Sequence, residues 1–330
     1  MVVPVAEVQY GFVLSGQFLP EDDPQQALEE MLEQVVAARE AGFDAVFAVQ
    51  HFLADFQFFQ PMLLLSRIAA ESGEMRLGTA VSLLSYYPPV LFAEEFATLD
   101  VLTGGRVILG VGTGYREEEF AALGVPRSER ISRFEEALPV IRQLWSGEPV
   151  SHEGRFTLDE ARLRLKPPQG DRIPVWIGAT GPQGIARAAR MGDEWLISPE
   201  MPLDRMQKNK ESFVDALDGV PSDDHLFPLL REAFVADDKD TAVRVAREPL
   251  ETKYAAYRRW GHQVGTFDEM ADSTFVLGDP DRCAELLSRY VHGYGTRFIG
   301  LRMQWPGLAH RDVLASIRRF GTDVLPRVRT

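Results

Sequence analysis

Short apolar segments alternate with longer amphipathic ones from the start of the chain. Residues 9–15 (QYGFVLS) and 43–49 (FDAVFAV) are short and almost wholly apolar, as is typical of strands that are buried on both faces. Between them, residues 24–41 carry apolar side chains at helical spacing, and Gly42 follows as a stop signal. This alternation of strand and helix predicts parallel strands covered by helices.

The same alternation continues to the C-terminus. Six further strands are predicted, at residues 77–81, 108–114, 173–179, 194–198, 225–236 and 297–303. Further helices are predicted at residues 61–72, 89–102, 128–145, 182–191, 203–217, 239–260, 280–291 and 311–325. Eight strands, each followed by a helix, predict one α/β domain over residues 1–330, a (β/α)8 TIM barrel with insertions.

Two segments interrupt this rhythm. Residues 151–168 (SHEGRFTLDEARLRLKPP) alternate polar and apolar positions around Glu153 and Gly154, which predicts a hairpin within a rim excursion at about 150–172. Residues 261–273 have little periodicity, and we expect a mobile loop that could cover a site.

Composition and charge narrow the class of protein. The 330 residues are 45% hydrophobic, enough for a large core, and 35 basic against 49 acidic residues give a net charge of -14. Such an acidic chain is expected to bind neither nucleic acid nor an anionic membrane. It has no apolar run long enough to span a bilayer, and its N-terminus does not resemble a signal peptide. We therefore expect a cytoplasmic protein, with the single cysteine, Cys283, buried in a helix.

Glycine-rich loops follow two of the predicted strands. Gly110, Gly112 and Gly114 follow the fourth strand, where bare backbone beside Thr113 and Tyr115 can approach a ligand closely; the alternative is a tight turn. After the fifth strand, a loop leads directly into a helix and predicts a phosphate-binding site at the helix N-terminus. It consists of Gly178, Ala179, Thr180, Gly181, Pro182 and Gln183. Arg130 and Arg133 could add positive charge there, or could only pair with Glu129 or Glu135.

His51 is the best catalytic candidate among the six histidines. It ends the second predicted strand and precedes Phe52 and Phe56, so it could titrate at the mouth of an apolar pocket, or it could be a core histidine bonded to a carbonyl. The aromatic residues expected to line a substrate pocket are Phe12, Phe52, Phe56, Tyr86 and Tyr87. These features suit a flat heteroaromatic cofactor with a phosphate tail, or a phosphosugar. No metal-ligand spacing or nucleophile elbow is present in the sequence.

Several motifs together resemble the bacterial luciferase-like flavin monooxygenase superfamily, which has a (β/α)8 barrel. They extend over almost the whole chain and include FDAVFAVQHF, RLGTAVSLL, AEEFATLDVLTGGRVILGVGTGY, IPVWIGATGP and FVLGDPDRCAELL. The resemblance implies reduced FMN, or the deazaflavin F420, in the barrel mouth. It matches His51 to the histidine needed for turnover and Ala80 and Val81 to a non-proline cis peptide. It also matches loops 112–115 and 178–184 to phosphate and ribityl contacts, and it implies a homodimer.

The sequence also departs from luciferase itself. Gly112 and Thr113 stand where luciferase has a reactive cysteine and a phosphate-binding arginine, Thr180 and Gly181 replace an acid and a serine, and Gln50 replaces the acid beside the histidine. These changes argue against light emission from a long-chain aldehyde. The GATGP form resembles F420-dependent branches, whereas the gapless fit around His51 favours FMN.

The resulting hypothesis is a two-component monooxygenase. It would use O2 and reduced FMN from a separate flavin reductase on an apolar or aromatic small molecule. One alternative is an F420-dependent hydride-transfer oxidoreductase. A second alternative is a non-catalytic flavin-binding partner subunit, against which the retained His51 and complete glycine loop argue.

Overall fold

Eight parallel strands form the centre of the molecule in the computed structural model, which describes residues 7–217 and 225–329. In the order of their pairing they are β11 (Glu194–Leu196), β10 (Val175–Gly178), β7 (Val107–Gly112), β5 (Arg76–Thr79), β3 (Ala45–Ala48), β1 (Gln9–Leu14), β14 (Phe298–Arg302) and β12 (Leu229–Val235). A parallel bridge between Ile197 and Leu229 joins the two ends of this order and closes the barrel. All eight correspond to predicted strands, so the (β/α)8 prediction is confirmed.

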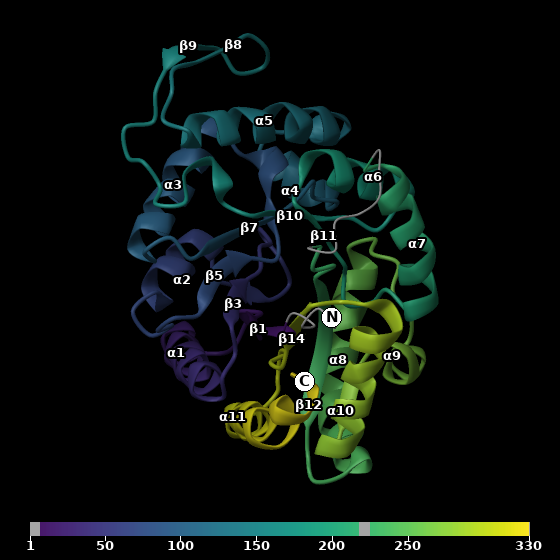
Figure 1. Ribbon diagram of the computed structural model, residues 1–330. Helices are drawn as coiled ribbons and strands as arrows, with labels where there is room; N and C mark the ends of the chain where they lie inside the picture. Colours follow the sequence, from purple (N-terminus) through teal and green to yellow (C-terminus); the bar gives the residue numbers. More distant parts are fainter. Residues whose placement is uncertain (1–6, 218–224, 330) are drawn as a thin grey trace, which may run out of the picture.

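Helices surround these strands on the outside (Figure 1). They are α1 (Pro24–Glu40), α2 (Pro61–Ile68), α3 (Pro89–Leu102), α4 (Glu117–Ala122), α5 (Arg130–Trp145), α6 (Pro182–Met191), α7 (Leu203–Asp215), α8 (Lys239–Arg259), α9 (Phe267–Ser273), α10 (Pro280–Ser288), α11 (His310–Arg319) and α12 (Leu325–Val328). Three short strands lie at the rim. The strand β2 (Gln17–Phe18) pairs with β4 (Gln57–Phe58), and β6 (Ser82–Leu83) pairs with β7. None of the helices within the described ranges is long and apolar enough to cross a membrane.

Two elements near the C-terminus were not predicted. The strand β13 (Val276–Gly278) pairs in parallel with the end of β12, at residues 233–235, and its three residues are too few for a recognisable pattern. The helix α9 occupies half of the segment expected to be an unstructured loop, so that prediction was wrong there. Thr266 and Glu269 form a reciprocal capping box at its start, and this Thr-x-x-Glu spacing was a usable signal.

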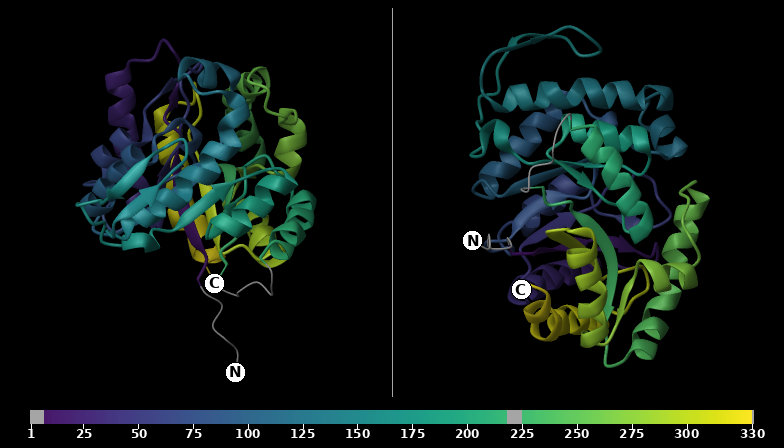
Figure 2. Two further views of the ribbon diagram at one scale, coloured as in Figure 1. Left: turned by 90° about the horizontal axis from the view of Figure 1, so that it is seen from above. Right: turned by 45° about the vertical axis from the view of Figure 1, so that its right-hand side comes forward.

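The predicted rim hairpin is present. Strands β8 (Val150–His152) and β9 (Leu158–Ala161) are antiparallel and project beyond α5 in both figures of the whole molecule (Figures 1 and 2). Glu136 of α5 accepts hydrogen bonds from Arg155 at its backbone N–H (2.7 Å) and guanidinium (3.0 Å). These bonds fix the hairpin to α5.

Aromatic side chains fill the lower part of the barrel. The rings of Phe47 and Phe298 pack against Trp176 at centroid distances of 5.5 and 4.9 Å. Gly11 lies on the same interior face, where an added Cβ would be 2.9 Å from both phenylalanine rings. Because this layer is closed, a ligand has room only above it, at the carboxyl ends of the strands.

Phe12 lies on the opposite side of its strand. It belongs to the core between barrel and helices, where its ring meets that of Phe43 edge-on at 5.9 Å. Since side chains alternate along a strand, the neighbouring Gly11 faces the interior and Phe12 cannot. The prediction that Phe12 lines the substrate pocket was therefore wrong.

Cys283 is fully buried in α10, as expected. Burial raises the pKa of its thiol to about 12, so the thiolate needed for reactivity is not populated near neutral pH.

Candidate active site

His51 lies just beyond β3 and is joined to a buried carboxylate. Its Nδ1 is 3.0 Å from Oε1 of Glu119, which comes from α4 and has no exposed surface. The same oxygen accepts the backbone N–H of Phe52 at 3.0 Å, and Tyr86 donates its hydroxyl to Oε2 at 3.0 Å. The sequence prediction included His51 but missed Glu119, which looked like one of three consecutive acids.

Arg116 completes the surroundings of Glu119. It donates to Glu119 at 3.1 Å and to the carbonyl of Phe52 at 2.8 Å, and its guanidinium stacks on the ring of Trp260 at 4.4 Å. Burial alone would raise the pKa of Glu119, but the contacts with His51, Phe52 and Arg116 together lower it. The carboxylate is thus ionised and can only accept.

This carboxylate determines the state of His51. Burial lowers the pKa of the imidazole below its ordinary value, although Glu119 opposes the shift, so the ring is neutral at neutral pH. Because Glu119 only accepts, we assign the proton to Nδ1, which leaves the lone pair on Nε2. A neutral imidazole held in this way is suited to general-base catalysis.

Four aromatic rings surround His51. Their centroids lie 5.1 to 6.0 Å from the imidazole and belong to Phe58, Tyr115, Tyr257 and Trp260. Tyr257 and Trp260 come from the end of α8, and sequence reasoning missed both because they are more than two hundred residues away in the chain. Phe56 is also part of this wall through Trp260, whereas Phe52 packs on Tyr86 at the Glu119 side.

The prediction that Tyr86 and Tyr87 line the substrate pocket was wrong. Tyr86 is buried and turned towards Glu119, and Tyr87 packs on Phe92 of α3 at 5.2 Å while its hydroxyl meets the Gln50 amide. The Gln50 carbonyl in turn accepts the N–H of Leu83 at 2.8 Å. These side chains hold the loop after β5 in place rather than line a pocket.

The peptide bond between Ala80 and Val81 is cis, as the resemblance implied. The side chain of Val81 lies between the two glycine-rich loops, because a Cβ added to Gly112 or Gly178 would come within 2.9 or 3.1 Å of its methyl groups. At Gly114, whose φ is +74°, an added Cβ would be 2.7 Å from the Tyr86 hydroxyl. These three glycines therefore make room for neighbouring side chains of the protein itself.

The predicted phosphate-binding site lies at the start of α6. Gly181 is the N-cap and has no side chain to cap the helix, and an added Cβ there would touch nothing within 4 Å. The arginine that contacts this loop is Arg205 of α7, which donates to the carbonyl of Thr180 at 3.1 Å. Arg130 instead donates to the carbonyl of Arg127 at 3.0 Å, so the structure does not bring it to the loop.

The remaining predicted residues lie around the same opening. Thr113 and Ala179 are half-buried, and Gln183 is exposed in the first turn of α6. Within residues 7–217 and 225–329, the donors near the opening that are buried without a hydrogen-bond partner include Ser82 Oγ, Tyr115 Oη, Ser198 Oγ and Trp260 Nε1. An uncapped helix N-terminus and unused donors fit a flavin-type cofactor with an anionic tail.

Two charged side chains inside the barrel mouth were also missed. Glu232 of β12 and Arg302 of β14 are register partners and pair at 3.1 Å, with Lys253 of α8 at 2.5 Å from the same carboxylate oxygen. A charged residue within an otherwise apolar strand was the available signal. The ring of His262 packs on that of Tyr115 at a centroid distance of 5.2 Å.

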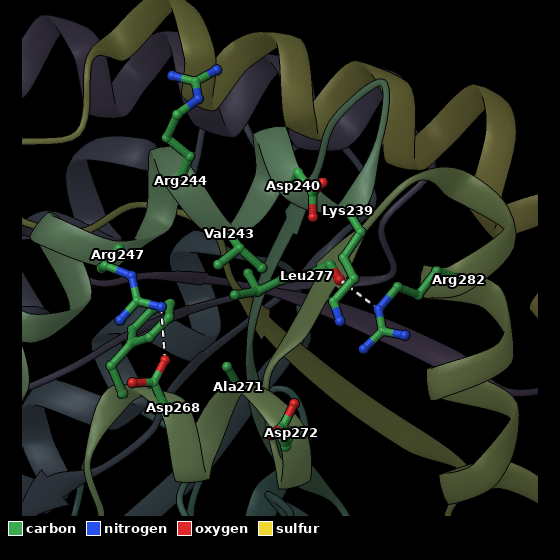
Figure 3. A pocket seen from close by; sticks show the side chains of 11 residues that line it. Lys239, Asp240, Val243, Arg244, Arg247, Asp268, Ala271, Asp272, Leu277 and Arg282 are labelled. Carbon is green, nitrogen blue, oxygen red and sulfur yellow. Dashed lines mark hydrogen bonds and ion pairs between the residues drawn. The ribbon is translucent and has the colours of Figure 1, made fainter.

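A separate cavity of about 460 Å³ lies outside the barrel, between α8, α9 and α10 (Figure 3). Two of its arginines are engaged by the protein: Arg247 pairs with Asp268 at 2.7 Å, and Arg282 donates to the carbonyl of Leu277 at 3.1 Å. It shares no lining residue with the site around His51.

Comparison with known proteins adds to this geometry. A curated relative, the F420-dependent glucose-6-phosphate dehydrogenase of Microbacterium testaceum, is 32% identical over 334 residues, 91% of this chain and 93% of the relative. The 5,10-methylenetetrahydromethanopterin reductase of Archaeoglobus fulgidus is 25% identical over 338 residues, 93% of this chain and 98% of the relative.

Solved structures show the same fold. The monooxygenase RslO1 from Streptomyces bottropensis aligns with a TM-score of 0.84 at 23% identity, over 96% of this chain and 99% of the other. An F420-dependent secondary alcohol dehydrogenase in complex with an F420-acetone adduct aligns with a TM-score of 0.79 at 24% identity, over 98% and 100% of the two chains. The sequence model described as luciferase-like monooxygenase matches residues 8–297. The chain therefore belongs to the luciferase-like monooxygenase family, whose members named above are oxidoreductases.

Proposed function

We propose that the protein is an F420-dependent oxidoreductase that interconverts a small alcohol and the corresponding carbonyl compound. The single observation that carries the proposal is the His51–Glu119 pair, which presents an unprotonated Nε2 inside an aromatic cage. The 32% identical relative is named an F420-dependent dehydrogenase and matches over nearly its whole length, which favours F420 over FMN. The earlier preference for FMN is not confirmed.

The first turn of α6, with Arg205 and the unused hydroxyls of Ser82 and Tyr115, would hold the cofactor. When bound, F420 supplies the hydride acceptor or donor. Nε2 of His51 would take the proton from the substrate hydroxyl during oxidation and return it during reduction. Glu119 would stabilise the imidazolium, and the rings of Tyr257 and Trp260 would exclude water.

Anaerobic titration with F420 and, separately, with FMN tests the cofactor. We expect saturable quenching of the F420 fluorescence, and bleaching of its absorbance when a suitable alcohol is added. Tight binding of FMN with no binding of F420 would refute the proposal.

A luciferase-like monooxygenase remains the second candidate. The gapless resemblance around His51 and the apolar packing of the aromatic cage, which would limit access of water to a bound flavin, favour it. It would require O2, reduced FMN from a separate reductase and an apolar substrate. Oxygen uptake dependent on reduced FMN and on a substrate would identify it. A non-catalytic partner subunit would have no need for the buried His51–Glu119 pair.

The proposal includes a homodimer, which the family resemblance implies. Leu63 of α2 and Leu102 of α3 are 78% and 56% exposed, on helices that contact one another. Light scattering is expected to give twice the chain mass, and Leu63→Glu to give a monomer, whereas Leu165→Glu at the rim excursion should not. A wild-type monomer would contradict this part.

A further inference from the structure

Arg302 is placed inside the barrel mouth by the alternation of β14. Phe298 faces the interior, and a Cβ at Gly300 would meet Leu230 and Val13, which also face inward. Arg302 is two residues further along the strand and so lies on the same face, one step nearer the opening. The side chain of Arg302 is only 8% exposed. A buried guanidinium at this position needs partners.

The protein supplies hydrogen-bond partners for only part of the Arg302 guanidinium. Nη1 of Arg302 donates to Glu232 at 3.1 Å. Nε of Arg302 is buried without a hydrogen-bond partner, and Nη2 forms no hydrogen bond with any residue of the described ranges. Nε and Nη2 form one edge of the guanidinium, whose two parallel N–H groups match a carboxylate or phosphate bidentately.

Glu232 cannot turn to this edge, because its oxygens are already occupied. Oε1 accepts from Lys253 at 2.5 Å and Tyr254 at 2.8 Å, and Oε2 accepts from Trp305. All of these side chains are buried. The carboxylate therefore orients the guanidinium and leaves its other edge available.

The free edge belongs to the same site as His51. The charge of Arg302 contributes to the lowered pKa of His51, which places the two groups within electrostatic reach. Tyr257 lies between His51 and the group around Glu232. Its ring is 5.8 Å from the imidazole and 5.8 Å from Nζ of Lys253, which shares Oε1 of Glu232 with Arg302. A small molecule could thus touch Nε2 of His51 at one end and Arg302 at the other.

Net charge does not by itself favour an anion here. The carboxylate of Glu200, paired with His262 at 3.6 Å, also acts on Arg302 and Lys253, so two acids oppose two bases. The specific feature is the unengaged donor edge of Arg302, because a guanidinium forms stronger hydrogen bonds with a charged acceptor than with a neutral one.

We propose that this edge of Arg302 binds an anionic group of the substrate, so that the protein acts on a small alcohol or carbonyl compound carrying a carboxylate or a phosphate. The inference rests on the proposed function for the reacting end of the molecule, and it replaces the expectation of a purely apolar substrate. Arg302 makes the contact, and Lys253 shares the carboxylate of Glu232 with it.

Calorimetric titration of the cofactor-free protein tests the proposal with matched probes at constant ionic strength. Lactate is compared with 1,2-propanediol, and glycerol 3-phosphate with glycerol. We expect at least one charged probe to bind the wild type at least tenfold more tightly than its neutral counterpart. Arg302→Lys keeps the positive charge beside Glu232 but lacks the two parallel N–H groups of the guanidinium, and it should weaken binding of that charged probe at least tenfold. Arg302→Gln should weaken it by at least the same factor.

Arg259→Gln is the matched control, because Arg259 pairs with Asp55 on the exposed rim at 2.7 Å and should leave probe binding unchanged. Equal binding of charged probes by the wild type and Arg302→Lys, or no binding of either charged probe, would overturn the proposal. Each variant is also titrated with F420. A loss of F420 affinity in Arg302→Lys without a loss of probe binding would assign the edge to the cofactor and overturn the inference. Failure of F420 to bind the wild type would refute the proposed cofactor instead, since the probe titrations contain none.

Discussion

Nδ1 of His51 and Oε1 of Glu119 lie 3.0 Å apart, although 68 residues separate them in the chain. The carboxylate has no exposed surface and accepts from four groups, so its position is fixed by packing and hydrogen bonds together. Glu119 holds the imidazole in one orientation and one protonation state. It acts as a positioning residue for the proposed base.

Replacing Glu119 with glutamine should impair catalysis but not cofactor binding. The amide can donate to Nδ1, which would favour the tautomer protonated at Nε2 and leave the base in only a minor fraction of the protein. We expect a fall in kcat of about 10²-fold or more with little change in cofactor affinity. Glu118→Gln, an exposed neighbour on α4, is the control. Unchanged turnover in Glu119→Gln, measured by cofactor absorbance, would exclude this positioning role.

The pH dependence of kcat/KM should report His51. The base must be unprotonated to act, and burial lowers its pKa, so activity is retained below the ordinary histidine value of about 6.5 and is lost only as pH falls further. Glu119→Gln removes the charge that opposes this shift, so its acidic limb should move to lower pH. His51→Ala should lack the limb and retain cofactor binding. An acidic limb that is the same in all three proteins would assign it to another group.

The architecture followed from the sequence because each strand is a short apolar run that is followed by an amphipathic helix, a local pattern. Only part of the candidate site could be predicted from the sequence. His51 stood at a strand end, whereas Glu119, Tyr257 and Trp260 meet it through tertiary packing that no local pattern specifies. Phe12 shows a further limit, since the residue type does not reveal which face of a doubly buried strand it occupies.

The glycines around Val81 give a prediction about stability. An alanine at Gly112 would place its Cβ 2.9 Å from a Val81 methyl group, and we expect it to destabilise the fold by about 1–3 kcal/mol. Gly181→Ala is the matched control, because nothing lies within 4 Å and its φ of -110° suits any residue, so the change should stay within about 0.5 kcal/mol. Denaturant unfolding measures both. Equal stability of the two variants would mean that Val81 moves aside without cost.

Lys253 should make the free energy of unfolding depend on pH. Burial and the neighbouring Arg302 lower the pKa of its ammonium to about 7, against 10.5 in the unfolded chain. Between these values the unfolded chain holds a proton that the folded protein lacks, so stability should rise with pH. Above pH 9 the buried thiol of Cys283, with its raised pKa, opposes this trend, which makes pH 7 to 9 the informative window.

Lys253→Met keeps the length of the side chain and should flatten the rise seen in urea unfolding, whereas the exposed Lys208→Met should not. If the wild type and Lys253→Met show the same slope, Lys253 stays protonated beside Glu232 throughout, and the positive charge beside Arg302 does not vary over this range.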